Sequence, residues 1–195
     1  SLGLESVKLL ASTYAQLVEG QTKEVQFSFD TNHGTDDYLK IIEGKTASLI
    51  KTSAKLGAMA SGCKQETISS ISKWAWHSGI IFQITDDILD LSSDEKTLGK
   101  PSGNDIIEGT YTLPVLIALE KYPEKINKIL SDISENKVGV NEVINEFNND
   151  EIISESKLFL KTHLEKSESA AMEIDNKIVK NILLDINRYL IERSN

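Results

Sequence analysis

The chain has 195 residues and a net charge of −9, with 39% hydrophobic and 26% charged residues and few Gly and Pro. This composition is that of a folded protein, and it excludes disordered and fibrous classes. The acidic balance argues against a nucleic-acid-binding surface, which needs clustered Lys and Arg. The length suffices for one buried core, so we expect a single domain over residues 1–195.

The cysteine content and hydropathy indicate the setting. The lone Cys63 cannot form an internal disulfide, which favours a reduced, cytoplasmic location. No apolar run reaches the roughly 18 residues that a membrane span requires. We therefore expect a soluble protein without a transmembrane segment.

The first third of the chain predicts two helices. Apolar residues at helical spacing from 2 to 25 predict a helix with one inward-facing side. Turn-forming residues follow between 27 and 35, where Thr35 can cap a second helix whose first turn carries Asp36 and Asp37. That helix is expected to run to about Ala60. The apolar side of the first helix contains Leu2, Leu4, Val7, Leu10, Ala11, Tyr14, Leu17 and Val18.

The remaining elements are also helical. A break at 61–63 precedes a third helix that ends near Leu91, and its apolar residues cover more than one stripe, as in the central helix of a bundle. A polar loop over 92–108 has the length of a functional loop. Helices are expected again over 113–119, 124–132, 140–150, 152–170 and 175–192. Because no strand pattern occurs, the predicted fold class is an all-α bundle.

The strongest chemical signal is acidic. Asp86, Asp87 and Asp90 lie within five residues of an apolar helix, and Gln83, Asp86 and Asp90 share one face. A buried carboxylate without a partner is costly, so a cation is expected there, and oxygen ligands suit Mg²⁺. The spacing does not fit a calcium-binding EF-hand loop. The alternative is a helix end whose acids face solvent.

Two lysine-containing pairs accompany this helix. Lys45-Thr46 and Gly99-Lys100 are each, taken alone, typical of a surface. Together with the acidic helix they would supply the positive charge that an anionic diphosphate needs.

These residues, in this order over about 95 positions, carry a resemblance to a known family. The chain resembles the trans-type isoprenyl diphosphate synthases (polyprenyl synthetases), from near the middle of their sequence to the C-terminus. The matching segments are Gly20-Gln21, Tyr38, Lys45-Thr46, the second aspartate-rich motif Gln83–Asp90, the run Leu98–Pro114 and, more weakly, the tail Arg188–Arg193.

The resemblance implies a helical bundle of the isoprenyl diphosphate synthase type and an Mg²⁺-dependent prenyltransferase. Such an enzyme condenses isopentenyl diphosphate with an allylic diphosphate, and the family implies a homodimer. By this resemblance Asp86, Asp87 and Asp90 bind magnesium, with Asp86 the foremost ligand and Asp87 the least certain. Asp105 would lie in the second coordination shell of the metal.

The substrate-binding and catalytic residues are also carried over from the family. Lys45 and Lys100 would contact the allylic diphosphate, and Thr46 and Gln83 would direct oxygen dipoles toward the carbocation. Gln21 and Tyr38 are expected to be structural.

Aromatic side chains on the third helix have two interpretations. Trp74, Trp76 and Phe82 could line a prenyl tunnel, but residues at this spacing more often belong to a core. His77 has no carboxylate or Cys at ligand spacing, so we expect a structural or surface role.

The chain departs from the family pattern in two places. Nothing in residues 1–60 resembles the family's first aspartate-rich motif, since Asp36-Asp37 lacks its spacing, so the bundle is expected to be incomplete at its N-terminus. Thr110 replaces a Lys that many relatives carry. A noncatalytic scaffold subunit or an inactive fragment therefore stays open as an alternative, whereas a terpene cyclase is disfavoured because its second metal motif differs.

Overall fold

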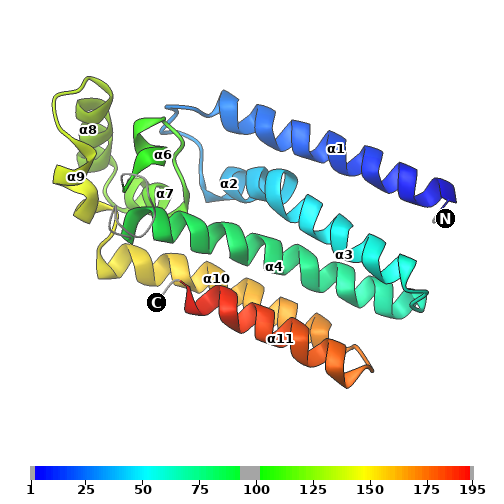
Figure 1. Cartoon of the computed structure of the whole chain (residues 1–195). Coiled ribbons are helices and arrows are strands. Elements are labelled where there is room, and N and C mark those ends of the chain that lie inside the picture. The colour runs from blue at the N-terminus through cyan, green and yellow to red at the C-terminus, as the bar shows by residue number, and fades with distance from the viewer. Residues whose placement is uncertain (1–2, 93–101, 194–195) are drawn as a thin grey trace.

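The computed structural model describes residues 3–92 and 102–193, and within these ranges every regular element is helical (Figure 1). The predicted all-α fold class is confirmed. The elements are α1 (Gly3–Gln26), α2 (Thr35–Ile42), the π-helical turn η1 (Glu43–Ala47), α3 (Ser48–Ala60), α4 (Gln65–Ser92), α6 (Asn104–Ile107), α7 (Leu113–Lys121), α8 (Pro123–Ser134), α9 (Val140–Val143), the 3-10 turn η2 (Ile144–Glu146), α10 (Asp150–Met172) and α11 (Lys177–Glu192).

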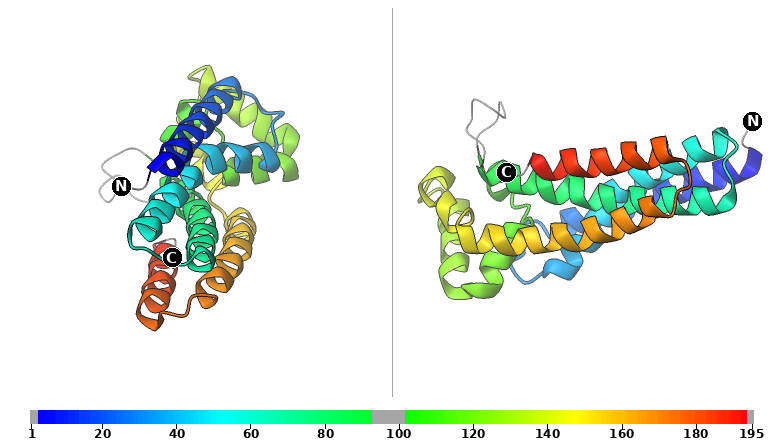
Figure 2. Two further views of the ribbon diagram at one scale, coloured as in Figure 1. Left: turned by 90° about the vertical axis from the view of Figure 1, so that its right-hand side faces the viewer. Right: turned by 90° about the horizontal axis from the view of Figure 1, so that it is seen from below.

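Helix α4 lies at the centre, as its apolar sequence predicts. It packs extensively against α3 and α10, and α1 and α11 lie on opposite sides of it (Figures 1 and 2). Ile80, Ile81 and Ile84 on α4 are fully buried. The shorter helices α6 to α9 gather around the C-terminal end of α4, which is where the acidic residues lie. In the described part of the chain no helix is long and apolar enough to cross a bilayer.

The expected inward side of α1 is wrong. The buried residues of this helix are Thr13 and Gly20, and its apolar row faces outward. The reason is that α1 contacts α2, η1 and α3 only along the side that carries these two small residues. We call the exposed residues the α1 row: Leu4, Val7, Leu10, Tyr14 and Val18, which are 44–70% exposed.

Two glycines allow α1 to cross η1 closely. A Cβ atom on Gly20 would lie 2.7 Å from the backbone nitrogen of Lys45, and one on Gly44 would lie 2.7 Å from the carbonyl oxygen of Gln16. No larger residue fits either position without moving a backbone. This crossing therefore sets the distance between α1 and the turn that carries Lys45.

Helix boundaries differ from expectation in two places. Gly34, in extended backbone, occupies the N-cap of α2, so Thr35 is its first helical residue and makes no capping bond. The helix expected over 140–150 is instead the short α9 and η2, because Asn149 caps α10 by accepting a hydrogen bond from the backbone N–H of Ile152.

The aromatic residues of α4 belong largely to the core. Trp74 is buried and donates its indole N–H to Oδ1 of the buried Asn187 on α11, at 3.1 Å. Trp76 and Phe82 are partly buried and pack against the main cluster. Ser78 also donates to Asn187 Oδ1, at 2.7 Å, which satisfies this buried polar group.

Candidate active site

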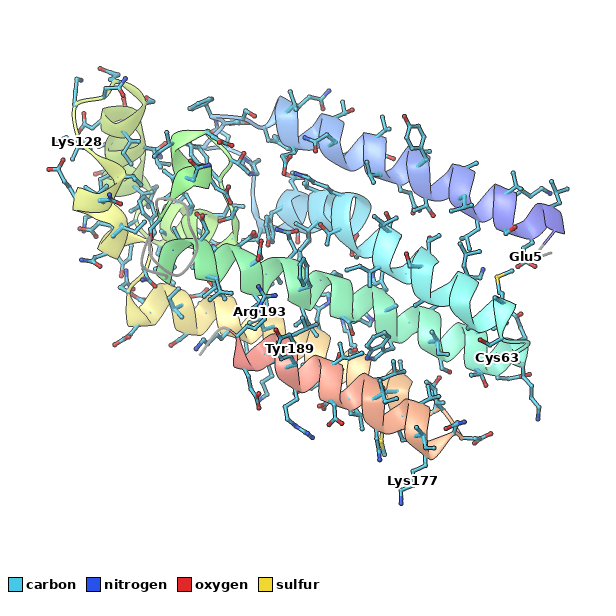
Figure 3. All side chains as sticks on the ribbon, in the orientation of Figure 1. Glu5, Cys63, Lys128, Lys177, Tyr189 and Arg193 are labelled. Atoms are coloured by element: carbon cyan, nitrogen blue, oxygen red, sulfur yellow. The ribbon has the colours of Figure 1, made fainter. Side chains whose placement is uncertain are left out.

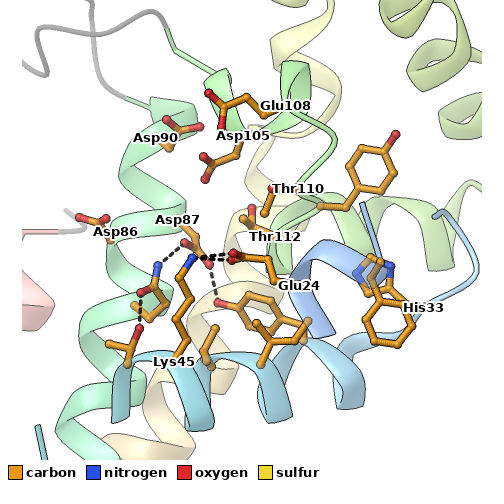
Figure 4. A pocket seen from close by; sticks show the side chains of 17 residues that line it. Glu24, His33, Lys45, Asp86, Asp87, Asp90, Asp105, Glu108, Thr110 and Thr112 are labelled. Atoms are coloured by element: carbon orange, nitrogen blue, oxygen red, sulfur yellow. Dashed lines mark hydrogen bonds and ion pairs between the residues drawn. The ribbon is translucent and has the colours of Figure 1, made fainter. Parts of the chain in front are cut away.

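A pocket of about 460 Å³ opens at the C-terminal half of α4 (Figure 4). Its walls come from the end of α1, from α2 and η1, from α4 and from the segment around α6. It joins the predicted residues Lys45, Thr46, Gln83 and Asp105 to the acidic motif. The lining residues are Glu24, Phe27, His33, Tyr38, Ile41, Ile42, Lys45, Thr46, Gln83, Asp86, Asp87, Asp90, Asp105, Glu108, Thr110, Tyr111 and Thr112.

The π-helical turn η1 positions Lys45 and Thr46. The helix that begins at Thr35 widens by one π turn over Glu43–Ala47 before α3 resumes its ordinary pitch. A π turn shifts the side chains that follow it around the helix axis, and such turns are frequent at functional sites. Here the widened turn faces α1 on one side and α4 on the other.

A chain of hydrogen bonds links η1 to the acidic motif. The Thr46 hydroxyl donates to Oε1 of Gln83 at 2.8 Å, and Nε2 of Gln83 donates to Oδ1 of Asp87 at 2.9 Å. The Tyr38 hydroxyl donates to the other carboxylate oxygen of Asp87 at 2.5 Å. Tyr38 and Gln83 therefore fix the orientation of Asp87, which is 4% exposed.

Burial and mutual repulsion raise the pKa values of the acids. Burial raises the pKa of Asp87 to about 7, although the bonds from Tyr38 and Gln83 oppose this. Burial, with repulsion from Asp105, raises the pKa of Asp90 to about 6, and burial also raises that of Asp105. Asp90 and Asp105, which both line the pocket, lie near one another (Figure 4). These acids therefore keep their protons to a higher pH than ordinary carboxyl groups do.

Lys45 is held by an acid that the sequence interpretation missed. Its Nζ lies 2.8 and 2.6 Å from the two carboxylate oxygens of Glu24 on α1. Gln21 also donates to Glu24, at 2.8 Å. The available signal was the helical spacing that puts Glu24 one turn after Gly20, on the side of α1 that faces η1.

Asp86 occupies a different environment from Asp87. Its side chain is 54% exposed and lies 3.6 Å from a guanidinium nitrogen of Arg193, just beyond the end of α11. Arg193 also lies over the ring of Phe82, 5.6 Å from its centroid. Figure 3 shows Arg193 against α4, at the opposite end of α11 from Lys177. Asp86, which we expect to be the foremost metal ligand, is therefore the more exposed of the two. Asp87, the least certain ligand, is the one held in place by hydrogen bonds.

Three further residues complete the account of the predicted site. Lys100 lies outside the described residues. Asp105 is half-buried on α6, whose start is tied to α4 by a bond from the Gly103 N–H to the Asp90 carbonyl oxygen at 3.0 Å. Thr110 lines the pocket. The sequence interpretation did not assign His33, Glu108 or Thr112, which also line it.

The lining chemistry fits a hard divalent cation. Six lining residues are Asp or Glu and one is Lys, so the pocket is strongly anionic when the acids are ionised. In the described residues no three acids, His or Cys converge into a complete metal-binding group. Mg²⁺ does not need such a cage, because it typically takes one or two carboxylates and completes its shell with water and phosphate oxygens. The donor set therefore fits Mg²⁺.

Comparison with known proteins defines the class of protein. The family model described as polyprenyl synthetase matches residues 2–149. The chain belongs to the polyprenyl synthetase family.

Individual relatives agree with this assignment. The chain is 41% identical over 120 residues to a nonaprenyl diphosphate synthase of Mycobacterium tuberculosis, a match that covers 62% of the chain. It is 29% identical over 186 residues to heptaprenyl diphosphate synthase component 2 of Bacillus subtilis, which covers 95% of the chain. A crystal structure of heptaprenyl diphosphate synthase from Staphylococcus aureus superimposes with a TM-score of 0.89 over 98% of the chain, at 29% identity.

The chain is shorter than these relatives. The matches span 36% of the Mycobacterium protein, 53% of the Bacillus protein and 61% of the Staphylococcus chain.

Proposed function

We propose that this chain supplies the diphosphate-binding pocket of a prenyltransferase that condenses isopentenyl diphosphate with an allylic diphosphate. The observation that carries the proposal is the convergence of Lys45 and Thr46 with the acidic motif of α4 on one pocket. These groups come from segments about 40 residues apart, and their convergence gives one basic and several acidic groups around a single space.

The proposed cofactor is Mg²⁺, held by Asp86, Asp87 and Asp90, with Asp105 behind them. An anionic pocket repels a diphosphate, so cations must accompany the substrate. When bound, magnesium would neutralise the negative charge on the departing pyrophosphate. The raised pKa values of Asp87 and Asp90 support this assignment, because neighbouring acids that resist ionisation gain most from a cation.

The chain's own residues have distinct tasks. Lys45 would bind phosphate oxygens once its ammonium group leaves Glu24. Lys100, which precedes α6 in the sequence and lies outside the described residues, is proposed as a second diphosphate contact. Thr46 and Gln83 bond to each other, and their oxygens are proposed to face the developing carbocation from this position.

Water must be kept from a carbocation, and the pocket has an apolar wall for this purpose. Ile41 and Ile42 of α2 line the pocket and are 6% and 4% exposed. An apolar wall lowers the local water density and strengthens the electrostatic interactions inside the pocket.

The proposed assembly is a cytoplasmic homodimer. The α1 row supports it, because five exposed apolar residues at helical spacing are typical of a surface that another chain covers. The name of the Bacillus relative, component 2, raises a second partner as the alternative.

Turnover tests this function. The chain is incubated with isopentenyl diphosphate, farnesyl diphosphate and Mg²⁺, and products are read by mass spectrometry. We expect longer prenyl diphosphates, and their loss in Asp87→Asn but not in Asp175→Asn, whose carboxylate is exposed between α10 and α11. Absence of products together with absence of Mg²⁺-dependent diphosphate binding would overturn the proposal and favour a noncatalytic scaffold.

A further inference from the structure

Two histidines from distant parts of the chain face each other outside the carboxylate pocket. His77 on α4 and His163 on α10 are both half-buried, and their Nδ1 atoms lie 3.1 Å apart. The ring centroids are 5.2 Å apart and the rings are tilted by 58°. Periodicity and motifs do not reveal this pair, because 86 positions separate the two residues.

The protonation of the pair leaves lone pairs available. A hydrogen bond between two Nδ1 atoms uses one proton, so one of the two nitrogens already presents its lone pair to the other. Burial lowers the pKa of His77, and burial with repulsion from His77 and Lys166 lowers that of His163 to about 4. Both rings are therefore neutral near pH 7, which is the state that binds metals.

The spacing matches bidentate coordination. Imidazole nitrogens bind Zn²⁺ at about 2.0–2.1 Å, so two of them on one ion stand roughly 2.9 Å apart at a right angle and roughly 3.4 Å apart at a tetrahedral angle. The observed 3.1 Å lies between these limits. To bind one ion, the ring that donates in this pair must move its proton to Nε2, and both rings must turn so that their Nδ1 lone pairs point away from the line between them and toward the ion.

We propose that His77 and His163 bind one transition-metal cation of the Zn²⁺ type, bridging α4 and α10. Imidazole favours such borderline cations, whereas the carboxylate pocket favours Mg²⁺. His77 precedes Asp87 by ten residues, which puts the two sites about 15 Å apart along α4. The chain thus sorts two kinds of cation onto two sites, and this proposal does not depend on the prenyltransferase function.

The surroundings leave room for the remaining ligands. His77 lines an open hollow of about 400 Å³ together with Lys73, Glu165, Lys166 and Glu173. Lys73 pairs with Glu173 at 3.8 Å, so the hollow holds acids as well as bases. The hollow reaches His77 but is not lined by His163, and within the described residues no third His, Cys, Asp or Glu joins the pair, so water would supply the remaining ligands.

Competition with a chromophoric chelator measures the affinity for Zn²⁺, in tag-free protein and with excess Mg²⁺ present. Either His77→Gln or His163→Gln is expected to weaken binding at least tenfold. His33→Gln is the matched control, because His33 is the third histidine of the chain and its Nδ1 bonds to the Asp30 carbonyl. Equal affinity in all four proteins, or loss of binding only in Asp87→Asn, would overturn the proposal.

A second measurement uses the unaltered protein and does not depend on how the variants fold. Long-range ¹H–¹⁵N correlation spectra of the imidazoles are recorded during the Zn²⁺ titration. We expect the ring that donates in the pair to move its proton to Nε2, and the Nδ1 signals of both His77 and His163 to shift on metal binding, while the signals of His33 do not change. Unchanged spectra of both rings at saturating Zn²⁺ would contradict the site.

Discussion

At the scale of single residues, two opposing effects act on the ionisation of Asp87. Its side chain is buried, which disfavours the ionised form. Its carboxylate also accepts hydrogen bonds from Tyr38 and Gln83, which favour the ionised form. Burial outweighs these donors and raises its pKa to about 7. The folded protein therefore binds a proton here that the unfolded chain, with a pKa near 3.8, releases.

The first prediction concerns this proton. Protonated Asp87 contributes its full share of the folding stability below about pH 4, and this contribution is lost as the pH rises through about 7. Without metal, the charged Asp87 therefore destabilises the fold at about pH 8. Asp87→Asn should raise the free energy of unfolding there by about 1–3 kcal/mol. Urea denaturation checks this, with Asp175→Asn as control. A variant less stable than the parent at that pH would show that the ionised carboxylate is stabilising.

The second prediction concerns Glu24, which would compete with the proposed diphosphate for Lys45. Removing its charge in Glu24→Gln frees the ammonium group, and because partly exposed ion pairs are worth up to about 1 kcal/mol, pyrophosphate should bind roughly two- to fivefold more tightly. Titration calorimetry with Mg²⁺ present gives the affinity. Glu19→Gln, which breaks the exposed pair with Lys23 on the same helix, should change nothing. Weaker binding in Glu24→Gln would mean that Glu24 assists the substrate.

At the scale of elements, the glycine crossing of α1 and η1 determines where Lys45 lies. Gly20 is buried and meets the Lys45 backbone, whereas Gly57 on α3 is exposed and a Cβ atom there would meet nothing within 4 Å. Replacing Gly20 by Ala therefore tests the steric requirement of the crossing, and replacing Gly57 by Ala tests helix propensity alone.

The third prediction follows from this contrast. Gly20→Ala should destabilise the protein by about 1–3 kcal/mol, because its Cβ forces two backbones apart. Gly57→Ala should stabilise it by about 0.5–1 kcal/mol, because Ala is the better helix former. Thermal denaturation compares the two variants. Equal effects of both substitutions would show that the crossing tolerates a side chain.

The helices were predictable from the sequence and the details of their packing were not. Apolar spacing identified α1, α4 and α10, since the 3.6-residue period is a local property of the chain. The outward face of the α1 row was not predictable, because periodicity shows that a helix has an apolar side but not what covers it. The π turn η1 has no distinctive pattern in its five residues.

Only the residues of the candidate site that belong to sequence motifs were predictable. Lys45, Thr46, Gln83 and Asp105 could be named in advance, and they line one pocket with the acidic motif. Glu24 was missed because its partner lies 21 positions away, on another helix. The different environments of Asp86 and Asp87 depend on Tyr38 and Arg193, which only the tertiary structure brings near them.

At the scale of the whole molecule, the α1 row is an apolar surface that no other described element covers. Helix α1, which carries this row, lies on the opposite side of α4 from α11 (Figure 2). Exposed apolar residues in such a row gain free energy when a second surface covers them, at about 25 cal/mol per Å².

The fourth prediction tests this surface. The unaltered chain is expected to dimerise in sedimentation velocity experiments, and Leu10→Lys, at the middle of the row, should shift it to monomer. Leu158→Lys on α10 replaces a residue that is 60% exposed and lies outside the row, so the dimer should persist. Dissociation by both substitutions, or by neither, would show that the α1 row is not the interface.

The proposed function requires that the pocket between η1 and α4 binds diphosphate together with Mg²⁺. Titration calorimetry of the chain with inorganic pyrophosphate, with and without Mg²⁺, tests it most directly. We predict binding only with Mg²⁺, weakened at least about tenfold by Lys45→Ala, because a charge-assisted hydrogen bond contributes about 1.5–3 kcal/mol. The same affinity without Mg²⁺, or in Lys45→Ala, would contradict the account.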